Sequence, residues 1–125
     1  MMVIDSSVWV ALYNESDSQH KKAIEAGHSF SQVVLTEYII LETSTLLLKK
    51  VGEAASEKFL EFALDNSEVT VLCSSVDFFH DVIRLFRKLK NKKLSFVDVS
   101  LLYLSRTHEI VTFDAALEKE IRKLK

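Results

Sequence analysis

Short runs rich in β-branched residues alternate with helical patterns along this chain of 125 residues, and this alternation constrains the fold most strongly. The runs lie at residues 3–4, 33–35, 69–73 and 109–113. Each run is too short for a helix and is typical of a strand in a parallel sheet. Strands that are joined through helices form right-handed crossovers, so the strands run parallel and helices cover both faces. The sequence therefore predicts an α/β fold with three layers, α/β/α, around a central parallel sheet of four to five strands.

The segments between these runs carry apolar side chains at helical spacing, with start and stop signals. Asp17 or Ser18 is expected to cap the second helix, and Gly27 is expected to end it. The expected helices cover residues 6–13, 17–27, 37–51, 53–66, 76–89, 94–103 and 114–125. The helix at 94–103 is almost wholly apolar, so we expect it to be buried.

Composition limits the class of protein. Hydrophobic residues make up 48% of the chain, with two glycines and no proline, which excludes a disordered or low-complexity protein. We expect one domain that spans residues 1–125. The formal net charge of −2 neither requires nor excludes a nucleic-acid partner. Cys73 is the only cysteine, which excludes an intramolecular disulfide, and we expect it to be an inert buried thiol.

Neither the N-terminus nor any other segment resembles a membrane or export signal. No apolar run approaches the length needed to span a bilayer, and the N-terminus lacks the basic region of a secretion signal. A single cysteine also suits a reducing compartment. We therefore expect a cytoplasmic protein with no membrane partner.

Two acids directly follow predicted strands. Asp5 ends the apolar run at the N-terminus, and Asp114 ends the last run. Because ligands gather at the carboxyl ends of parallel strands, both side chains are expected at one edge of the sheet. Both residues also precede a predicted helix, so N-capping is the ordinary alternative explanation for each of them.

Two further acids lie in apolar surroundings. Glu42 shares its helical face with Tyr38, Ile39 and Leu46, and Asp98 lies in the apolar segment 94–102. An isolated ionised carboxylate in such a place costs several kcal/mol or more, so it must be paired, protonated or bound to a cation. Neither acid has a Lys or Arg three or four residues away on its helix. A salt bridge to a distant cation remains the alternative to a metal site.

Asp5, Glu42, Asp98 and Asp114 could together form one acidic pocket. All-oxygen ligation suits a hard divalent ion, Mg²⁺ or Mn²⁺. Such an ion activates water and stabilises the negative charge that builds up on a phosphate, which supports phosphodiester hydrolysis. The residues therefore predict a metal-dependent hydrolase acting on a phosphodiester.

The chain resembles a PIN domain, in particular the VapC-type toxin ribonucleases. The matching segments are residues 3–7, 36–42, 94–98 and 111–114, which read VIDSS, TEYIILE, LSFVD and VTFD. They occur in the order of the family and near its spacing, and they span almost the whole chain. Each motif alone is weak, whereas the ordered set is fairly specific.

This resemblance implies a magnesium- or manganese-dependent endoribonuclease with a PIN-like fold. It implies catalytic and metal-binding roles for Asp5, Glu42, Asp98 and Asp114, and supporting roles for the hydroxyls of Ser7 and Thr112. It also implies an RNA substrate, a homodimer, and a small antitoxin protein as partner. Many relatives carry another acid two positions after the last one, where this chain has Ala116, so protein ligands for a second metal are in question.

Other features have two explanations each. A basic stretch could guide RNA by phosphate contacts, or could simply be a solvated helix end. Its residues are Arg84, Arg87, Lys88, Lys90, Lys92 and Lys93. The apolar helix around residues 38–48 could supply a dimer contact.

Three other functions compete with a toxin ribonuclease. The first is a PIN nuclease of RNA processing outside a toxin system. The second is a phosphoacceptor domain of the receiver type, which fits the length and the acid after the first strand. Domains of that class have paired acids after their first strand, whereas in this chain Asp5 is followed by Ser6 and Ser7. The third is an interaction module that keeps the fold without catalysis.

Overall fold

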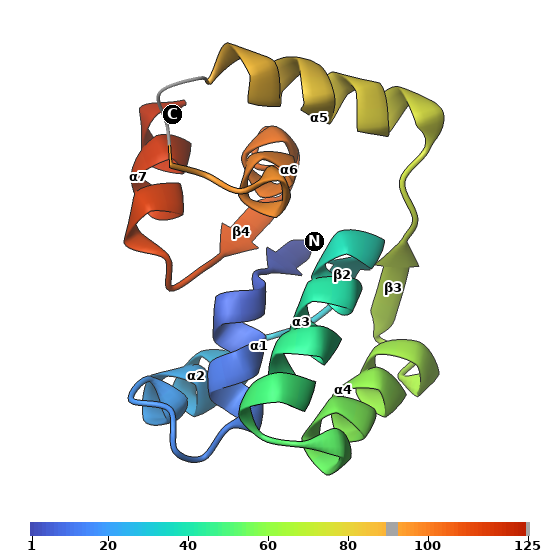
Figure 1. Ribbon diagram of the computed structural model, residues 1–125, viewed down its shortest axis with the longest axis vertical. Coiled ribbons are helices and arrows are strands. Elements are labelled where there is room, and N and C mark those ends of the chain that lie inside the picture. Colours follow the sequence, from blue (N-terminus) through green and yellow to red (C-terminus); the bar gives the residue numbers. More distant parts are fainter. Residues whose placement is uncertain (90–92, 125) are drawn as a thin grey trace.

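The computed structural model of the protein describes residues 1–89 and 93–124 (Figure 1). Strands and helices alternate in this part of the chain, as the sequence predicts. The strands are β1 Met2–Ile4, β2 Val33–Thr36, β3 Val69–Leu72 and β4 Glu109–Val111. The helices are α1 Ser6–Tyr13, α2 His20–Gly27, α3 Glu37–Lys50, α4 Glu53–Asp65, α5 Val76–Lys88, α6 Phe96–Leu104 and α7 Ala115–Lys123.

The four strands form one parallel sheet in the order β3-β2-β1-β4. Val3 in β1 is aligned with Val34 in β2 and with Ile110 in β4. The principal helix contacts link α1 to α4 into one group and α5 to α7 into another, and Figure 1 shows the two groups at opposite ends of its view. The predicted α/β/α fold with a parallel sheet of four strands is confirmed.

The order in which the chain adds strands to the sheet reverses at β1. It passes from β1 to β2 and β3, and then returns to place β4 on the other side of β1. In open α/β sheets, ligands bind outside the carboxyl ends of the strands at such a reversal. Asp5 follows β1 and Thr112 follows β4, so both lie at this point.

Aromatic rings fix α1 in the core. Trp9 is 1% exposed, and its Nε1 donates a hydrogen bond to the carbonyl oxygen of Ile4 at 2.9 Å. Phe59 of α4 is fully buried, and its ring lies 5.8 Å from the rings of both Trp9 and Tyr13. These contacts hold α1, the helix that Asp5 caps, against α4.

The expectation of a buried Cys73 is wrong, because its thiol is exposed. The strand before it, β3, lies at an edge of the sheet and has partly exposed residues at both ends and exposed residues between. Strand order decides this exposure, and the apolar run 69–73 gives no information on strand order.

Several predicted boundaries differ from the structure, and three of the differences have a clear cause. The apolar helix begins at Phe96 rather than at 94, because Ser95 serves as its N-cap. Strand β4 ends at Val111 rather than at 113, since backbone N–H groups beyond it donate to side chains, that of Phe113 to Ser7 Oγ and that of Asp114 to Thr112 Oγ1. Helix α2 begins at His20, because Asp17 caps the preceding turn instead: its Oδ1 accepts from the Gln19 amide at 2.8 Å.

Candidate active site

Asp5 lies between β1 and α1 and is 3% exposed. Its backbone N–H donates to the carbonyl oxygen of Val111 at 2.8 Å, which joins the ends of β1 and β4. Its Oδ1 accepts from the Ser6 backbone N–H at 2.8 Å and caps α1. Capping therefore accounts for one of its two carboxylate oxygens.

The second oxygen of Asp5 is held by two hydroxyls. Ser7 Oγ donates to Asp5 Oδ2 at 2.9 Å, and Thr112 Oγ1 donates to the same oxygen at 2.8 Å. Each hydroxyl also accepts a backbone N–H from the segment after β4, that of Phe113 for Ser7 and that of Asp114 for Thr112. Since both ends of each hydroxyl are engaged, the orientation of the Asp5 carboxylate is fixed.

Glu42 projects from α3 and is partly buried. Its Oε1 accepts a hydrogen bond from the hydroxyl of Ser6, which also donates to Asp5 Oδ1 at 3.4 Å. Burial raises the pKa of Glu42 above its ordinary value; the hydrogen bond from Ser6 opposes the rise, and the charges of Asp5 and Asp98 add to it. Ser6 thus links two carboxylates that repel each other.

Asp98 lies in the first turn of α6, where it forms a capping box with Ser95. Its Oδ2 accepts from the Ser95 backbone N–H at 3.0 Å, and Ser95 Oγ accepts from the Asp98 backbone N–H at 3.1 Å. Burial raises the pKa of Asp98; hydrogen bonds from Ser95 oppose this, and the charges of Asp5 and Asp114 add to it.

Asp114 caps α7 through one oxygen. Its Oδ1 accepts from the backbone N–H groups of Ala116 at 2.9 Å and Leu117 at 3.1 Å. The capping explanation therefore holds for Asp114 as it does for Asp5. Both acids nevertheless also line a common cavity with the other two.

That cavity has a volume of about 470 Å³, and Asp5, Glu42, Asp98 and Asp114 all line it. Within residues 1–89 and 93–124, no Lys or Arg forms a salt bridge with any of these four acids, so distant pairing does not explain Glu42 or Asp98 there. No salt bridge among these residues therefore offsets the repulsion between the carboxylates. The structure brings the four predicted acids together from four different elements.

The carboxylates share the cavity without converging on one point. In the described part of the chain, no three His, Cys, Asp or Glu side chains stand close enough to hold one ion. Local donors orient each acid instead: Ser7 and Thr112 for Asp5, and Ser6 for Glu42. The donor set is all oxygen and anionic, which fits a hard divalent cation in chemistry.

Sequence reasoning missed several residues of this cavity, and three of them add a charge or bridge two acids. Ser6 bridges two acids, Asp17 adds a fifth carboxylate from the segment before α2, and Lys50 adds a cation from the last turn of α3. In the sequence, Ser6 and Asp17 look like ordinary turn residues, and Lys50 looks like a helix stop signal. No local signal separates them from such residues.

Comparison with known proteins gives the family. The sequence matches the PIN domain family over residues 2–122, almost the whole chain. The chain is a member of the PIN domain family. This membership excludes the receiver-type alternative. Among curated proteins, no sequence matches the chain.

Solved structures similar to this PIN domain include the sarcin–ricin loop cleaving toxin VapC20 of Mycobacterium tuberculosis. The two structures superpose with a TM-score of 0.86, which covers 95% of this chain and 94% of the VapC20 chain. Sequence identity between them is 21%. At that identity the match shows a shared fold.

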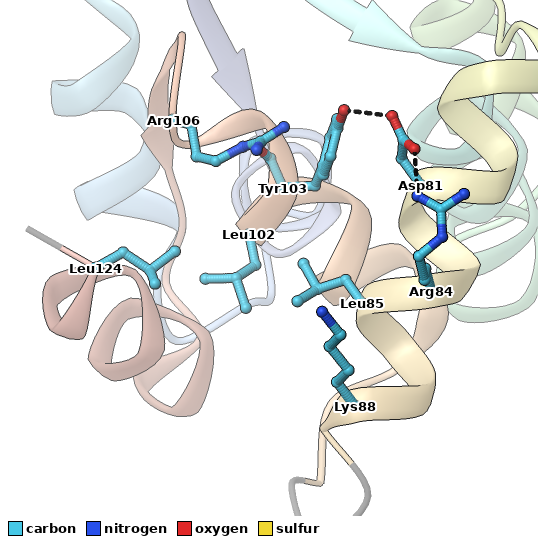
Figure 2. Close-up of a pocket in the computed structure, with 8 residues that line it drawn as sticks. All are labelled: Asp81, Arg84, Leu85, Lys88, Leu102, Tyr103, Arg106 and Leu124. Atoms are coloured by element: carbon cyan, nitrogen blue, oxygen red, sulfur yellow. Dashed lines mark hydrogen bonds and ion pairs between the residues drawn. The ribbon is translucent and has the colours of Figure 1, made fainter.

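The residues of the predicted basic stretch, which runs from Arg84 to Lys93, do not all lie at one site in this PIN domain. Arg84 and Lys88 line a separate pocket between α5, α6 and the end of α7 (Figure 2), and that pocket shares no lining residue with the acidic cavity. Lys93 is exposed at the approach to α6. Lys90 and Lys92 lie outside the described residues.

None of the helices in the described residues is long and apolar enough to span a membrane.

The contribution of Glu42 and Asp98 to the stability of this PIN domain should fall as pH rises in metal-free buffer. The pKa values of Glu42 and Asp98 are raised in the folded protein, so the folded state holds these protons more tightly than the unfolded state does. The resulting stabilisation is fully present below the ordinary carboxyl pKa of about 4 and is lost as pH rises through the raised values. The double variant Glu42→Gln and Asp98→Asn should therefore raise Tm by about 2–5 °C at neutral pH, after allowance for solvent screening. Thermal unfolding in a chelator at several pH values measures this.

Glu37 provides a control of opposite sign on the same helix as Glu42. Hydrogen bonds from the Ser74 hydroxyl and backbone N–H lower the pKa of Glu37. Its stabilising effect is present above its ordinary pKa and is lost as pH falls. Glu37→Gln should lower Tm at neutral pH. A Glu42 and Asp98 double variant that is less stable than the wild type at neutral pH would contradict the repulsion between these acids.

Proposed function

We propose that this PIN domain is a metal-dependent endoribonuclease, a hydrolase of RNA phosphodiester bonds. The observation that carries the proposal is that Asp5, Glu42, Asp98 and Asp114 gather in one cavity. This cavity lies at the point where the order of the strands in the sheet reverses. No cationic side chain of the described residues pairs with them. The carboxylates of such a cluster repel one another, and a divalent cation relieves that repulsion. A cation bound there would also support phosphodiester hydrolysis, because it activates water and stabilises negative charge on the phosphate.

The proposed cofactor is Mg²⁺ or Mn²⁺. We assign Asp5 and Asp98 as its direct ligands, and Glu42 and Asp114 as acids that complete the shell directly or through water. When bound, the cation activates a water molecule and neutralises charge on the phosphate. Because the carboxylates do not converge in the described conformation, some of their side chains have to rotate when it binds. Ala116 lies two residues beyond Asp114 and offers no carboxylate, so we propose protein ligands for one metal only.

The remaining residues of the cavity position these acids. Ser7 and Thr112 hold Asp5 Oδ2, which keeps that carboxylate oriented toward the cavity. Ser6 holds Glu42 near Asp5. The raised pKa of Glu42 suits a group that orients the attacking water and takes up its proton.

We propose that the biological role is that of a toxin restrained by a small antitoxin protein, in the cytoplasm. This rests on the family and on the likeness to VapC20, which is described as a toxin cleaving the sarcin–ricin loop. RNA processing outside a toxin system uses the same site chemistry and differs only in substrate and partner. A non-catalytic interaction module would keep the fold and the helix caps without cleavage.

RNA cleavage by the purified full chain tests the function. Incubation of the chain with a structured RNA and Mn²⁺ or Mg²⁺ should give discrete products, and excess EDTA should abolish them. Calorimetric titration of Mn²⁺ into the same preparation should show binding. Absence of both metal binding and cleavage would favour the interaction module.

Lys50 should contact the RNA phosphate next to the one that is cleaved. It is the one cation among the described residues that line the acidic cavity, and no described acid forms a salt bridge with it. We expect Lys50→Ala to raise KM roughly tenfold with a smaller effect on kcat, since a charge-assisted hydrogen bond contributes about that factor. Steady-state kinetics at several salt concentrations measures the change.

Lys49 is the matched control for Lys50. It has the same charge and lies one residue earlier in α3, but it does not line the cavity. Lys49→Ala should leave KM within about twofold of the wild-type value, and Lys50→Arg should restore most of the affinity. Equal effects of the two alanine variants would show that Lys50 acts only through general surface charge.

We expect the protein to form a homodimer through α3. Leu41 and Leu48 are 64% and 49% exposed and lie seven residues apart, so they share one face of the helix. Sedimentation at micromolar concentration should give a dimer, and Leu41→Glu with Leu48→Glu should give a monomer. Leu64→Glu on α4 is the control, since Leu64 is equally exposed but lies on another helix. A monomeric wild-type protein would reject the dimer.

A further inference from the structure

A second pocket, of about 330 Å³, lies between α5, α6 and the end of the chain at α7 (Figure 2). Asp98 is in the first turn of α6, whereas the α6 residues of this pocket are in its last turn or just beyond. Three cationic and three leucine side chains line the pocket. The cations are Arg84, Lys88 and Arg106, and the leucines are Leu85, Leu102 and Leu124.

Two of the cations are fixed by neighbouring groups. The guanidinium of Arg106 lies 3.9 Å from the centre of the Tyr103 ring, and its Nε donates to the Tyr103 carbonyl oxygen at 3.1 Å. Arg84 forms a salt bridge with Asp81 at 2.9 Å, and Tyr103 Oη donates to the other oxygen of Asp81 at 2.7 Å. Figure 2 shows this chain of contacts across the pocket wall. Cations that are already ordered lose less entropy when they bind an anion.

The cations exceed the anions in this pocket. Asp81 is the one acid among its described lining residues, and it is engaged by Arg84 and Tyr103. Lys88 forms no hydrogen bond or salt bridge with any described residue, and the terminal nitrogens of Arg106 are likewise without an acceptor among them. The pocket therefore attracts an anion, although the whole chain has a net charge of −2.

The leucines and Tyr103 argue against RNA as the occupant. One face of the Tyr103 ring is covered by Arg106, so that face cannot stack on a base. Leu102 is 3% exposed and Leu124 is 59% exposed, so an apolar surface extends from the pocket interior to its rim. The sugar–phosphate backbone of RNA is polar, so it would cover this apolar surface without making matching apolar contacts.

The exposed rim argues against a small molecule. Small ligands are usually buried over most of their surface. Here the side chain of Arg84 is 68% exposed, and Leu124 is largely exposed too. A peptide segment can cover the rim while one of its side chains fills the interior.

We propose that this pocket binds an acidic peptide segment of a partner protein. An apolar side chain of the segment would lie on Leu85 and Leu102, and a neighbouring carboxylate would pair with Arg106 and Lys88. The bidentate geometry of a guanidinium suits a carboxylate. The proposal is independent of RNA cleavage, because the pocket and the acidic cavity have no lining residue in common.

Peptide titration followed by NMR of the full, isotope-labelled chain tests the proposal. The probe is the peptide acetyl-Glu-Leu-Leu-Glu-amide, and the comparison peptide has both glutamates replaced by glutamine. The acidic peptide should shift the backbone amide signals of residues 81–88 and 102–106. The glutamine peptide should bind at least about tenfold more weakly, the factor expected for one lost charge-assisted hydrogen bond.

Variants of the cations locate the binding. Arg106→Gln and Lys88→Gln should each weaken acidic-peptide binding about tenfold, whereas Arg87→Gln should change it less than about twofold, because Arg87 lies on the same helix but outside the pocket. Thermal unfolding checks that each variant is folded. Equal binding of the two peptides, equal effects of the Arg87 and Arg106 variants, or larger shifts of these amides by a short oligouridylate would each overturn the proposal.

Discussion

Asp5→Asn should reduce RNA cleavage at least about a hundredfold while leaving the protein folded. Asparagine caps helices as well as aspartate does, so the bond from the Ser6 amide to Oδ1 can remain. The hydroxyls of Ser7 and Thr112 can turn to accept from the new amide. What the variant lacks is the negative charge at the centre of the acidic cavity, on which cation binding depends. Initial cleavage rates and circular dichroism of the purified variant measure the two effects.

Asp65→Asn is the control for Asp5→Asn, because Asp65 is exposed at the end of α4 and lies outside the acidic cavity. It should keep the wild-type cleavage rate within about twofold, as a solvated surface charge does. Wild-type cleavage by a folded Asp5→Asn protein would overturn the assignment of Asp5 as a metal ligand.

Phe59→Ala should lower the free energy of unfolding by about 3–5 kcal/mol. Phe59 is fully buried, and its ring packs against Trp9 and Tyr13 of α1. Truncation removes these contacts and leaves a cavity that the surrounding helices can fill only in part. Because Asp5 is the N-cap of α1, loosening of this helix should reduce cleavage activity as well. Urea unfolding followed through the fluorescence of Trp9, the only tryptophan, measures the change.

Leu64→Ala provides the comparison on the same helix. Leu64 is 64% exposed, so its truncation should change the free energy of unfolding by less than about 0.5 kcal/mol. Similar losses for Phe59→Ala and Leu64→Ala would show that the aromatic contacts between α1 and α4 do not anchor α1.

The sequence is sufficient to predict the architecture and the gathering of four acids in one cavity. Asp5 and Asp114 stand out because each ends a β-branched run, and Glu42 and Asp98 because an ionised group in apolar surroundings requires an explanation. All four signals are local. Lys50 and Asp17 gave no such signal, since a Lys in the last turn of a helix and an Asp in a polar turn are ordinary residues. Only the folded chain brings them to the same cavity.

Strand order and hydroxyl orientation were likewise beyond sequence reasoning. Cys73 follows an apolar run that would be buried in a central strand, but β3 is an edge strand and leaves it exposed. Ser6 bridges Asp5 and Glu42 through a contact between residues that are 36 positions apart. Contacts of this kind depend on how the elements pack, and no spacing rule within one element predicts them.

Anomalous diffraction from a crystal of the full chain soaked in Mn²⁺ tests the central claim most directly. The account predicts a peak inside the cavity, with an oxygen of Asp5 and an oxygen of Asp98 within coordination distance of it, and side chains rotated from the arrangement described above. A cavity without an anomalous peak, at a Mn²⁺ concentration that supports RNA cleavage by the same preparation, would contradict the account.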